Sequence, residues 1–404
     1  EVRQSGIVRN VVIGIVFGLV VGVAIGNGVI APRLQTPATA VKASLLLPAA
    51  VPAVAVPTAT ASAPRLTAET VPAVPNQPGP RPVAAIEWRM ASAFSGDLPQ
   101  VGALAKRIER NIKSISDGSF KITFHEPGAL VPPLKMFDAV RLGAIDAAFS
   151  SPTLWANKLP ALQLFSAIPF GPPLKEYLAW IYFGGGREIF QDLYRKNGIY
   201  SLFCGAAASG TAGWFRKPVR TPADFKGMTM AMTGLGAKVL EKLGVSTTQV
   251  NNADIAIAFE NGLIDSLALA QPASDIALGP ERQARYYYFP GWHQPAALFE
   301  LMVNLDRWKA LPGPQRVRIE AICGENVRYG LFKGEALQFE ALKEMTGRGV
   351  VIERWAGEIM RALRDAWQRV VSDEIANDRI FARTWSSLSE FRQDYEIWRE
   401  LSEL

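Results

Sequence analysis

The stretch from Thr221 to Pro272 decides the fold and reads TPADFKGMTMAMTGLGAKVLEKLGVSTTQVNNADIAIAFENGLIDSLALAQP. Three short apolar segments alternate in it with two segments of helical pattern, and a glycine follows each helical segment, as is common where a helix ends. The predicted strands are residues 228–232, 245–250 and 263–270, and the predicted helices are residues 237–243 and 253–261. This order predicts half of an open parallel α/β sheet, in which ligands bind outside the carboxyl ends of the strands.

Six further segments occur in an order that is informative as a set. They are WRMASAF at 88–94, PGALVPPLKMFDAVRLGAIDAAF at 127–149, AIPFG at 167–171, YFGGGREIFQDLY at 182–194, AGWF at 212–215 and RYYYFPGWHQPAALFELMVN at 285–304. Together with the deciding stretch they resemble the solute-binding proteins of TRAP (tripartite ATP-independent periplasmic) transporters, in particular the branch that binds 2-oxoacids and related carboxylates. The resemblance extends over residues 86–404 and implies an α/β, two-lobe periplasmic binding-protein fold of type II-like architecture.

The resemblance also shows which ligand groups this chain lacks. A carboxylate in a cleft needs a compensating cation, and arginine offers a planar fork that matches both oxygens. In the family that arginine follows a K-G-φ-x-φ run (φ, apolar), which here is residues 226–230, and the next residue is Ala231. A Glu-Trp pair that helps to hold a cation and the ligand follows the D-x-x of the third strand, here residues 265–267, and in its place this chain has Ala268 and Leu269. A polar Gln is expected shortly before the G-W-F element, but residues 206–211 read AAASGT.

Two interpretations of these substitutions stay open. The carboxylate site has been abandoned, or other side chains hold a different ligand. For a neutral ligand, the candidate hydrogen-bonding residues of the cleft are Thr229, Thr233, Gln271, Ser274 and Asp275.

An apolar run from Val11 to Ile30 has about the length needed to cross a bilayer. Arg3 and Arg9 precede it, which predicts a cytoplasmic N-terminus and a periplasmic main domain. A secretory signal peptide is the alternative, but its apolar region is usually shorter, so we expect an uncleaved single-pass anchor in the bacterial inner membrane. Residues 1–30 are thus predicted to form the cytoplasmic N-terminus and the transmembrane helix.

Glycines recur every fourth residue on one face of the predicted transmembrane helix. They are Gly14, Gly18, Gly22 and Gly26. Small residues in this register let a neighbouring helix approach closely, so we expect this face to pack against an integral membrane protein or a second copy of this chain. Residues 31–85, rich in Ala, Pro, Val and Thr, predict an extended linker that contacts the same partner.

Composition argues against several classes of function. A net charge of +6 is modest for 404 residues and forms no basic stripe with interleaved aromatics, so no nucleic-acid partner is expected. His125 and His293 are the only histidines, and neither lies in a metal-ligand or catalytic pattern, so we expect no catalytic residue, metal or cofactor, and no enzyme. Cys204 and Cys323 are interpreted as two buried free thiols, with a disulfide as the alternative.

Residues 314–348 and 356–377 predict two long helices, which complete a main domain at residues 86–404. The sequence favours an accessory or scaffolding subunit of a larger membrane complex, built from a solute-binding domain with a degenerate ligand site. The alternative is a functional receptor that delivers a small organic ligand to a TRAP permease.

Overall fold

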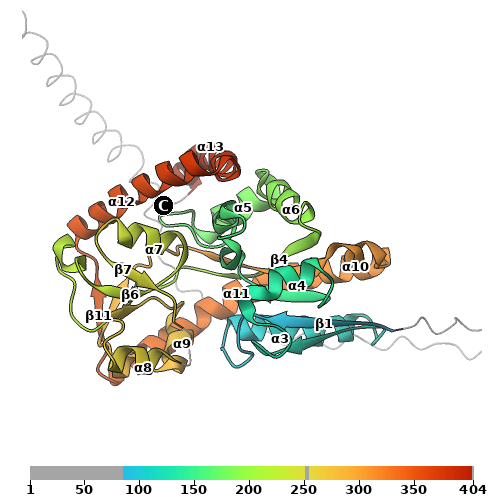
Figure 1. Ribbon diagram of the computed structural model, residues 1–404, viewed down its shortest axis with the longest axis horizontal. Coiled ribbons are helices and arrows are strands. Elements are labelled where there is room, and N and C mark those ends of the chain that lie inside the picture. Colours follow the sequence, from blue (N-terminus) through green and yellow to red (C-terminus); the bar gives the residue numbers. More distant parts are fainter. Residues whose placement is uncertain (1–84, 251–253, 403–404) are drawn as a thin grey trace, which may run out of the picture. The chain divides into compact units, whose positions relative to one another are not determined.

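The computed structural model describes residues 85–250 and 254–402, which form two α/β lobes, each built on one sheet (Figure 1). The predicted transmembrane helix, its glycine face and nearly all of the linker lie outside the described residues. Among the residues that are described, no helix combines the length and the apolar character needed to span a membrane.

The first lobe contains a five-stranded mixed sheet of order β2-β1-β3-β10-β4. β1 runs parallel to β2 and β3, whereas β10 is antiparallel to both β3 and β4. Every residue of β4 is buried, in keeping with its apolar sequence, because helices cover this strand. The strands are β1 (Ile86–Ser92), β2 (Phe120–His125), β3 (Ala147–Ser150), β4 (Ile199–Ala207) and β10 (Ala297–Asn304), and the main helices are α3 (Val101–Ile115), α4 (Met136–Arg141), α5 (Leu174–Phe183), α6 (Gly186–Arg195) and α10 (Leu305–Ala310).

The second lobe contains a six-stranded sheet of order β11-β9-β5-β8-β6-β7 and confirms the predicted parallel unit. β6 lies between β7 and β8 and is parallel to both, with α7 and α8 as the intervening helices. The strands are β5 (Gly213–Phe215), β6 (Thr229–Ala231), β7 (Ser246–Thr248), β8 (Ser266–Leu267), β9 (Tyr286–Phe289) and β11 (Val351–Arg354), and the helices are α7 (Gly234–Glu241), α8 (Ile255–Glu260) and α9 (Pro272–Asp275).

The strands are shorter than predicted, and β8 shows why. The apolar run at 263–270 predicted a strand of that length, but the chain leaves the sheet after Leu267. The backbone N–H of Ala270 donates to Asp275 Oδ1 at 3.0 Å instead of to a neighbouring strand. The carboxylate of Asp275, five residues onward, therefore replaces a neighbouring strand as the acceptor, and the strand ends early.

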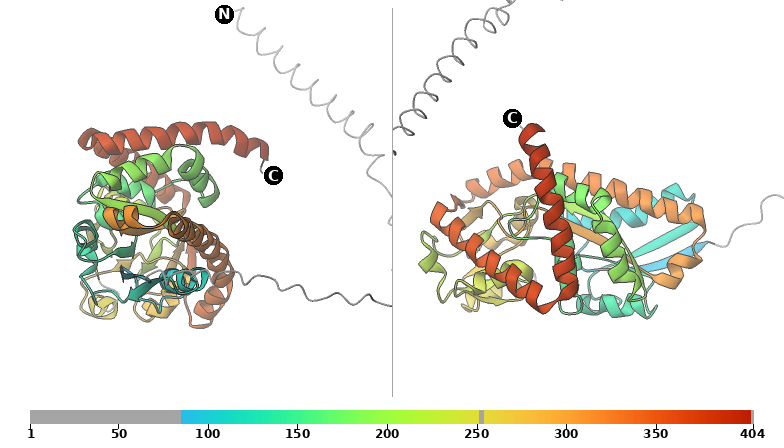
Figure 2. Two further views of the ribbon diagram at one scale, coloured as in Figure 1. Left: turned by 90° about the vertical axis from the view of Figure 1, so that its right-hand side faces the viewer. Right: turned by 90° about the horizontal axis from the view of Figure 1, so that it is seen from above.

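Three long helices complete the fold, and the first two match the predicted helices at 314–348 and 356–377. They are α11 (Gly313–Gly347), α12 (Gly357–Asn377) and α13 (Arg379–Ser402). α11 reaches both lobes: Ile319 and Ile322 belong to the core beside the first sheet, and Met345 to the core beside the second. Figure 2 shows α13 lying across the molecule over α5 and α6, with which it packs.

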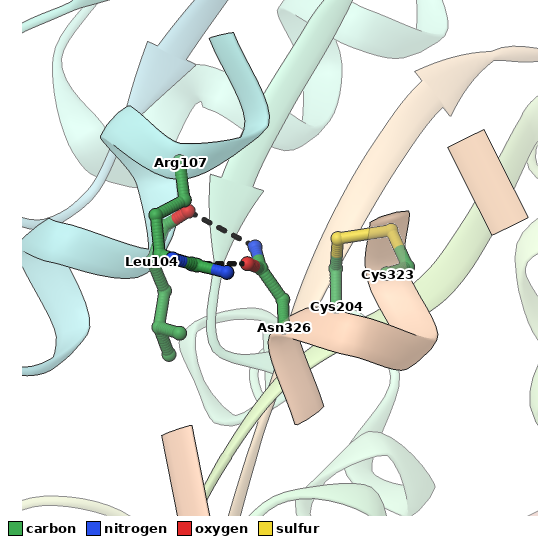
Figure 3. The surroundings of a disulfide bond; sticks show 5 residues. All are labelled: Leu104, Arg107, Cys204, Cys323 and Asn326. Carbon is green, nitrogen blue, oxygen red and sulfur yellow. Dashed lines mark hydrogen bonds between the residues drawn. A yellow bond between two sulfur atoms is a disulfide. The ribbon is translucent and has the colours of Figure 1, made fainter. Parts of the chain in front are cut away.

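Cys204 of β4 and Cys323 of α11 form a disulfide, so the interpretation as free thiols is wrong (Figure 3). Their Cα atoms lie 4.0 Å apart although 119 residues separate them in the sequence. Next to the bridge, the buried Asn326 donates from Nδ2 to the carbonyl oxygen of Leu104 at 3.0 Å and accepts from Arg107 Nε at 3.1 Å. The spacing of two cysteines says nothing about such an approach, because the packing of α11 on β4 produces it.

Replacing both cysteines, Cys204→Ala with Cys323→Ala, should lower the free energy of unfolding by about 2–5 kcal/mol, because the unfolded chain gains the freedom of a long loop. Urea unfolding of the double variant, followed by circular dichroism, measures this loss. Wild-type protein in a phosphine reductant is the matched control and should approach the variant. Equal urea midpoints for the variant and the oxidised wild type would contradict a stabilising bridge.

Candidate solute-binding cleft

A cavity of about 280 Å³ lies between the two lobes and is lined from both. The second lobe supplies the carboxyl ends of β6 and β8 and the start of α7, as expected for a parallel sheet. The first lobe supplies Ser151, which follows β3, together with Ser166 and Ala167. We call this cavity the cleft. An adjoining cavity of about 350 Å³ shares Ser151, Thr233 and other residues with it.

The structure brings Ala231, Ala268 and Leu269, which the sequence predicted to stand at the family's ligand positions, to the wall of the cleft. Thr233 lines both cavities. The remaining candidates separate into two groups.

Gln271, Ser274 and Asp275 line the adjoining cavity, whereas Thr229 lines neither. Thr229 stands at the amino end of β6, and its backbone N–H donates to Asp265 Oδ2 at 2.9 Å. The direction of the strand explains this, because ligands meet the carboxyl end of a parallel strand and Thr229 is at the other end.

The residues that line the cleft include no Asp, Glu, Lys or Arg. Its polar groups are the hydroxyls of Ser151, Thr153, Ser166, Thr233 and Thr248, the amides of Gln249 and Gln294, and the imidazole of His293. The sequence prediction missed most of these residues because they come from loops that only the folded chain brings together. His293 and Gln294 lie in the segment at 285–304 that carries part of the family resemblance.

His293 is buried, and burial lowers the pKa of its imidazole from 6.5 to about 4, so the ring is neutral near pH 7. Its Nδ1 has no hydrogen-bond partner in the part of the chain that the structure describes. Gln271 is similar: Nε2 donates to the carbonyl oxygen of Ser209 at 3.1 Å, but Oε1 accepts from none of the described residues. Buried polar atoms without partners are costly, so both atoms are candidates to meet a bound molecule.

Asp275 is already fully engaged within the protein. Trp214 Nε1 donates to Oδ2 at 3.0 Å, the Tyr287 hydroxyl donates to the same oxygen at 2.8 Å, and the Ala270 N–H donates to Oδ1. Burial raises the pKa of Asp275 to about 6, against the effect of these three donors. Asp275 therefore positions the wall of the adjoining cavity rather than offering a free carboxylate.

Metal binding by the described residues has little support from their arrangement. In residues 85–250 and 254–402, no cluster of three or more His, Cys, Asp or Glu side chains is placed to hold a metal ion.

Comparisons with known proteins identify the family. The model of the family described as bacterial extracellular solute-binding protein, family 7, matches residues 90–378. A monocarboxylate 2-oxoacid-binding periplasmic protein of Nostoc sp. is 29% identical over 320 residues, which are 79% of this chain and 87% of that protein. The chain therefore belongs to this family of TRAP solute-binding proteins.

Two solved structures show the same fold. A TRAP solute-binding protein of Bordetella bronchiseptica, with calcium and picolinate in one active site and an apo site in its dimer, is 31% identical at a TM-score of 0.76 and covers 79% of this chain and 95% of its own. One from Pseudoalteromonas atlantica, with sodium and pyruvate bound, is 28% identical at a TM-score of 0.75 and covers 79% and 97%. These relatives confirm the two-lobe α/β fold and the predicted family.

The comparisons bear on function only coarsely. The family consists of periplasmic solute-binding receptors rather than enzymes, and such receptors bind small ligands and work with membrane permeases. They support a solute receptor better than an accessory subunit.

His293 at the cleft and Asp275 at the adjoining cavity should have opposite effects on stability below pH 6.5. The folded protein keeps the Asp275 proton that the unfolded chain releases above pH 3.8, so this contribution is lost as pH rises through about 6. Between about pH 4 and pH 6.5, His293 is protonated in the unfolded chain but neutral in the folded protein. Its contribution to stability is therefore lost as pH falls through about 4.

His293→Gln should leave the Asp275 effect unopposed. Relative to the wild type, the variant should gain stability on going from pH 6.5 to pH 4.5, by on the order of 2 kcal/mol. Urea midpoints at both pH values measure this. His125→Gln, at a half-buried position at the end of β2, is the control and should follow the wild type. If the urea midpoints of His293→Gln and the wild type changed equally between the two pH values, the buried imidazole would not resist protonation.

Proposed function

We propose that this chain is a TRAP-type solute receptor whose ligand is a small uncharged molecule, delivered to a membrane permease. The observation that carries the proposal is a cleft between the lobes with no charged side chain in its lining. A carboxylate buried there would lose its hydration without gaining an opposite charge, which is unfavourable by several kcal/mol. The relatives that hold picolinate or pyruvate also hold calcium or sodium.

The chemistry of the cleft narrows the class of ligand. His293 Nδ1 at the cleft and Gln271 Oε1 at the adjoining cavity have no hydrogen-bond partner among the described residues, so N–H or O–H groups of a ligand can donate to them. The hydroxyls of Ser151 and Thr233 can donate or accept. Leu235 and Leu269 offer apolar surface on the wall of the cleft. A small amide, lactam or polyol with an apolar edge meets these requirements.

A second candidate function rests on the same substitutions. Ala231, Ala268 and Leu269 at the ligand positions also fit a receptor domain that has become an accessory or scaffolding subunit and binds no ligand. The two candidates differ in whether the cleft is ever filled.

We also propose that residues 86–404 form the main domain, held at the inner membrane by the predicted helix at 11–30 and the linker at 31–85. An anchor of this kind confines the receptor to the membrane surface and raises its effective concentration near a permease or another membrane partner. Alkaline extraction of native membranes tests this, because an anchored chain stays in the pellet and a cleaved one is released.

Ligand binding should raise the melting temperature of the purified chain, since a ligand present at 100 times its Kd stabilises the folded state by about 2.7 kcal/mol. A thermal-shift screen should therefore find uncharged amides, lactams or polyols, whereas pyruvate with calcium should give no shift.

The cleft variant for this screen is Ala268→Trp, which fills space that both cavities share and should abolish the shift. Its matched control is Ala256→Trp on the exposed face of α8, which should keep the shift. A shift with pyruvate and calcium would overturn the uncharged-ligand proposal. No shift with any compound, together with a stoichiometric membrane complex that lacks a permease, would establish the accessory subunit instead.

A further inference from the structure

A third cavity, of about 670 Å³, lies where α12 and α13 meet the chain before α5 and the segment between β9 and β10. We call it the C-terminal groove. Its size is within the range of small-molecule sites. Met360 and Arg364 of α12 form one side, Arg392 and Arg399 of α13 another, and Trp292 contributes to the surface between them.

The charges in the C-terminal groove do not cancel. Arg392 Nε lies 2.8 Å from Oε1 of the buried Glu176, and Arg399 Nη2 lies 2.6 Å from Glu396 Oε1. Each of these two ion pairs has no net charge. Arg364 is the fifth charged residue of the lining. Its positive charge has no carboxylate partner in the part of the chain that the structure describes.

Arg364 is held in place by aromatic side chains. Its guanidinium carbon lies 4.5 Å from the centroid of the Phe170 ring, and the Phe170 ring is stacked on Trp292 with centroids 5.8 Å apart. The backbone ties these rings together, because the Phe170 N–H donates to the carbonyl oxygen of Trp292 at 2.7 Å. Cation–π contact fixes the guanidinium but uses none of its N–H donors, which make no hydrogen bond to any described residue.

We infer that the C-terminal groove binds a small organic monocarboxylate, with Arg364 receiving the carboxylate and Phe170 and Met360 contacting the apolar body. The planar fork of arginine matches the two oxygens of a carboxylate. A single negative charge balances the groove, whereas a second charge on the ligand would be repelled by Glu176 and Glu396. The ligand is therefore a monoanion rather than a phosphate dianion.

The C-terminal groove is distinct from the cleft, because the two cavities share no lining residue. They lie on two sides of the same short segment, residues 290–295. Pro290, Gly291 and Trp292 line the C-terminal groove, and His293 and Gln294 line the cleft. The charge that the cleft lacks is thus present in a separate site nearby.

Benzoate is the probe that tests this proposal on the full chain, with the uncharged benzamide and inorganic phosphate as comparisons. In a ligand-observed NMR titration at low salt, benzoate should bind and the other two should not. Arg364→Gln should weaken benzoate binding about tenfold or more, since a hydrogen-bonded charge pair is lost. Arg364→Lys, which keeps the charge without the fork, should lose less.

Controls separate this site from the cleft and from general charge effects. Arg369→Gln removes an exposed arginine from another face of α12 and should bind benzoate as the wild type does. Ala268→Trp should also bind it normally, because its side chain lies outside the C-terminal groove. Loss of binding in Ala268→Trp, unchanged binding in a folded Arg364→Gln, or equal binding of benzoate and benzamide would each overturn the proposal.

Discussion

Each lobe depends on a buried carboxylate that neutral donors, rather than cations, stabilise. Asp275 in the second lobe and Glu300 in the first are both fully buried, and burial raises the pKa of each. Glu300 accepts from the hydroxyls of Ser150 and Ser201 and from Trp155 Nε1, so that it joins β3, β10 and the segment after β3. These networks reach the cleft directly, because Ser150 precedes Ser151 and Ala270, a donor to Asp275, follows Leu269. A buried carboxyl group is costly unless every acceptor is used, so the two networks hold the cleft walls in fixed positions.

The two lobes are joined by elements that cross between them, and α11 is the longest of these. Its first half is fixed to β4 by the Cys204–Cys323 disulfide and to α3 by the hydrogen bonds of Asn326, and its second half packs at Met345 in the core of the second lobe. One end of this helix is therefore covalently attached to the first lobe. The bridge and the hydrogen bonds of Asn326 therefore hold this part of α11 against the first lobe.

The sequence predicted the parallel β6–β7–β8 unit because strand and helix patterns are local, but it predicted neither the strand lengths nor the disulfide. The disulfide depends on two residues that are 119 positions apart in the sequence. The end of β8 depends on the hydrogen bond from Ala270 to the side chain of Asp275, which requires the turn at α9. The same limit applies to the site. Ala231, Ala268 and Leu269 were located because each follows a motif at a strand end, whereas Ser151 and Gln294 come from loops whose meeting point only the tertiary structure determines. Thr229 shows the converse: a polar residue next to the right motif stands at the wrong end of its strand.

The charged residues that stabilise the lobes are not the residues that line the cleft. The lobes, their sheets and the cleft between them are those of TRAP receptors, yet the lining of the cleft is uncharged. The fold does not require an arginine at position 231, because β6 ends at Ala231 and pairs in parallel with β7 and β8. A charged side chain at the ligand site can therefore be lost without loss of the architecture. The carboxylates that stabilise the lobes, Asp275 and Glu300, are separate from the positions that would recognise a ligand. A receptor built in this way can change the class of molecule it binds while its walls and its closing motion stay the same.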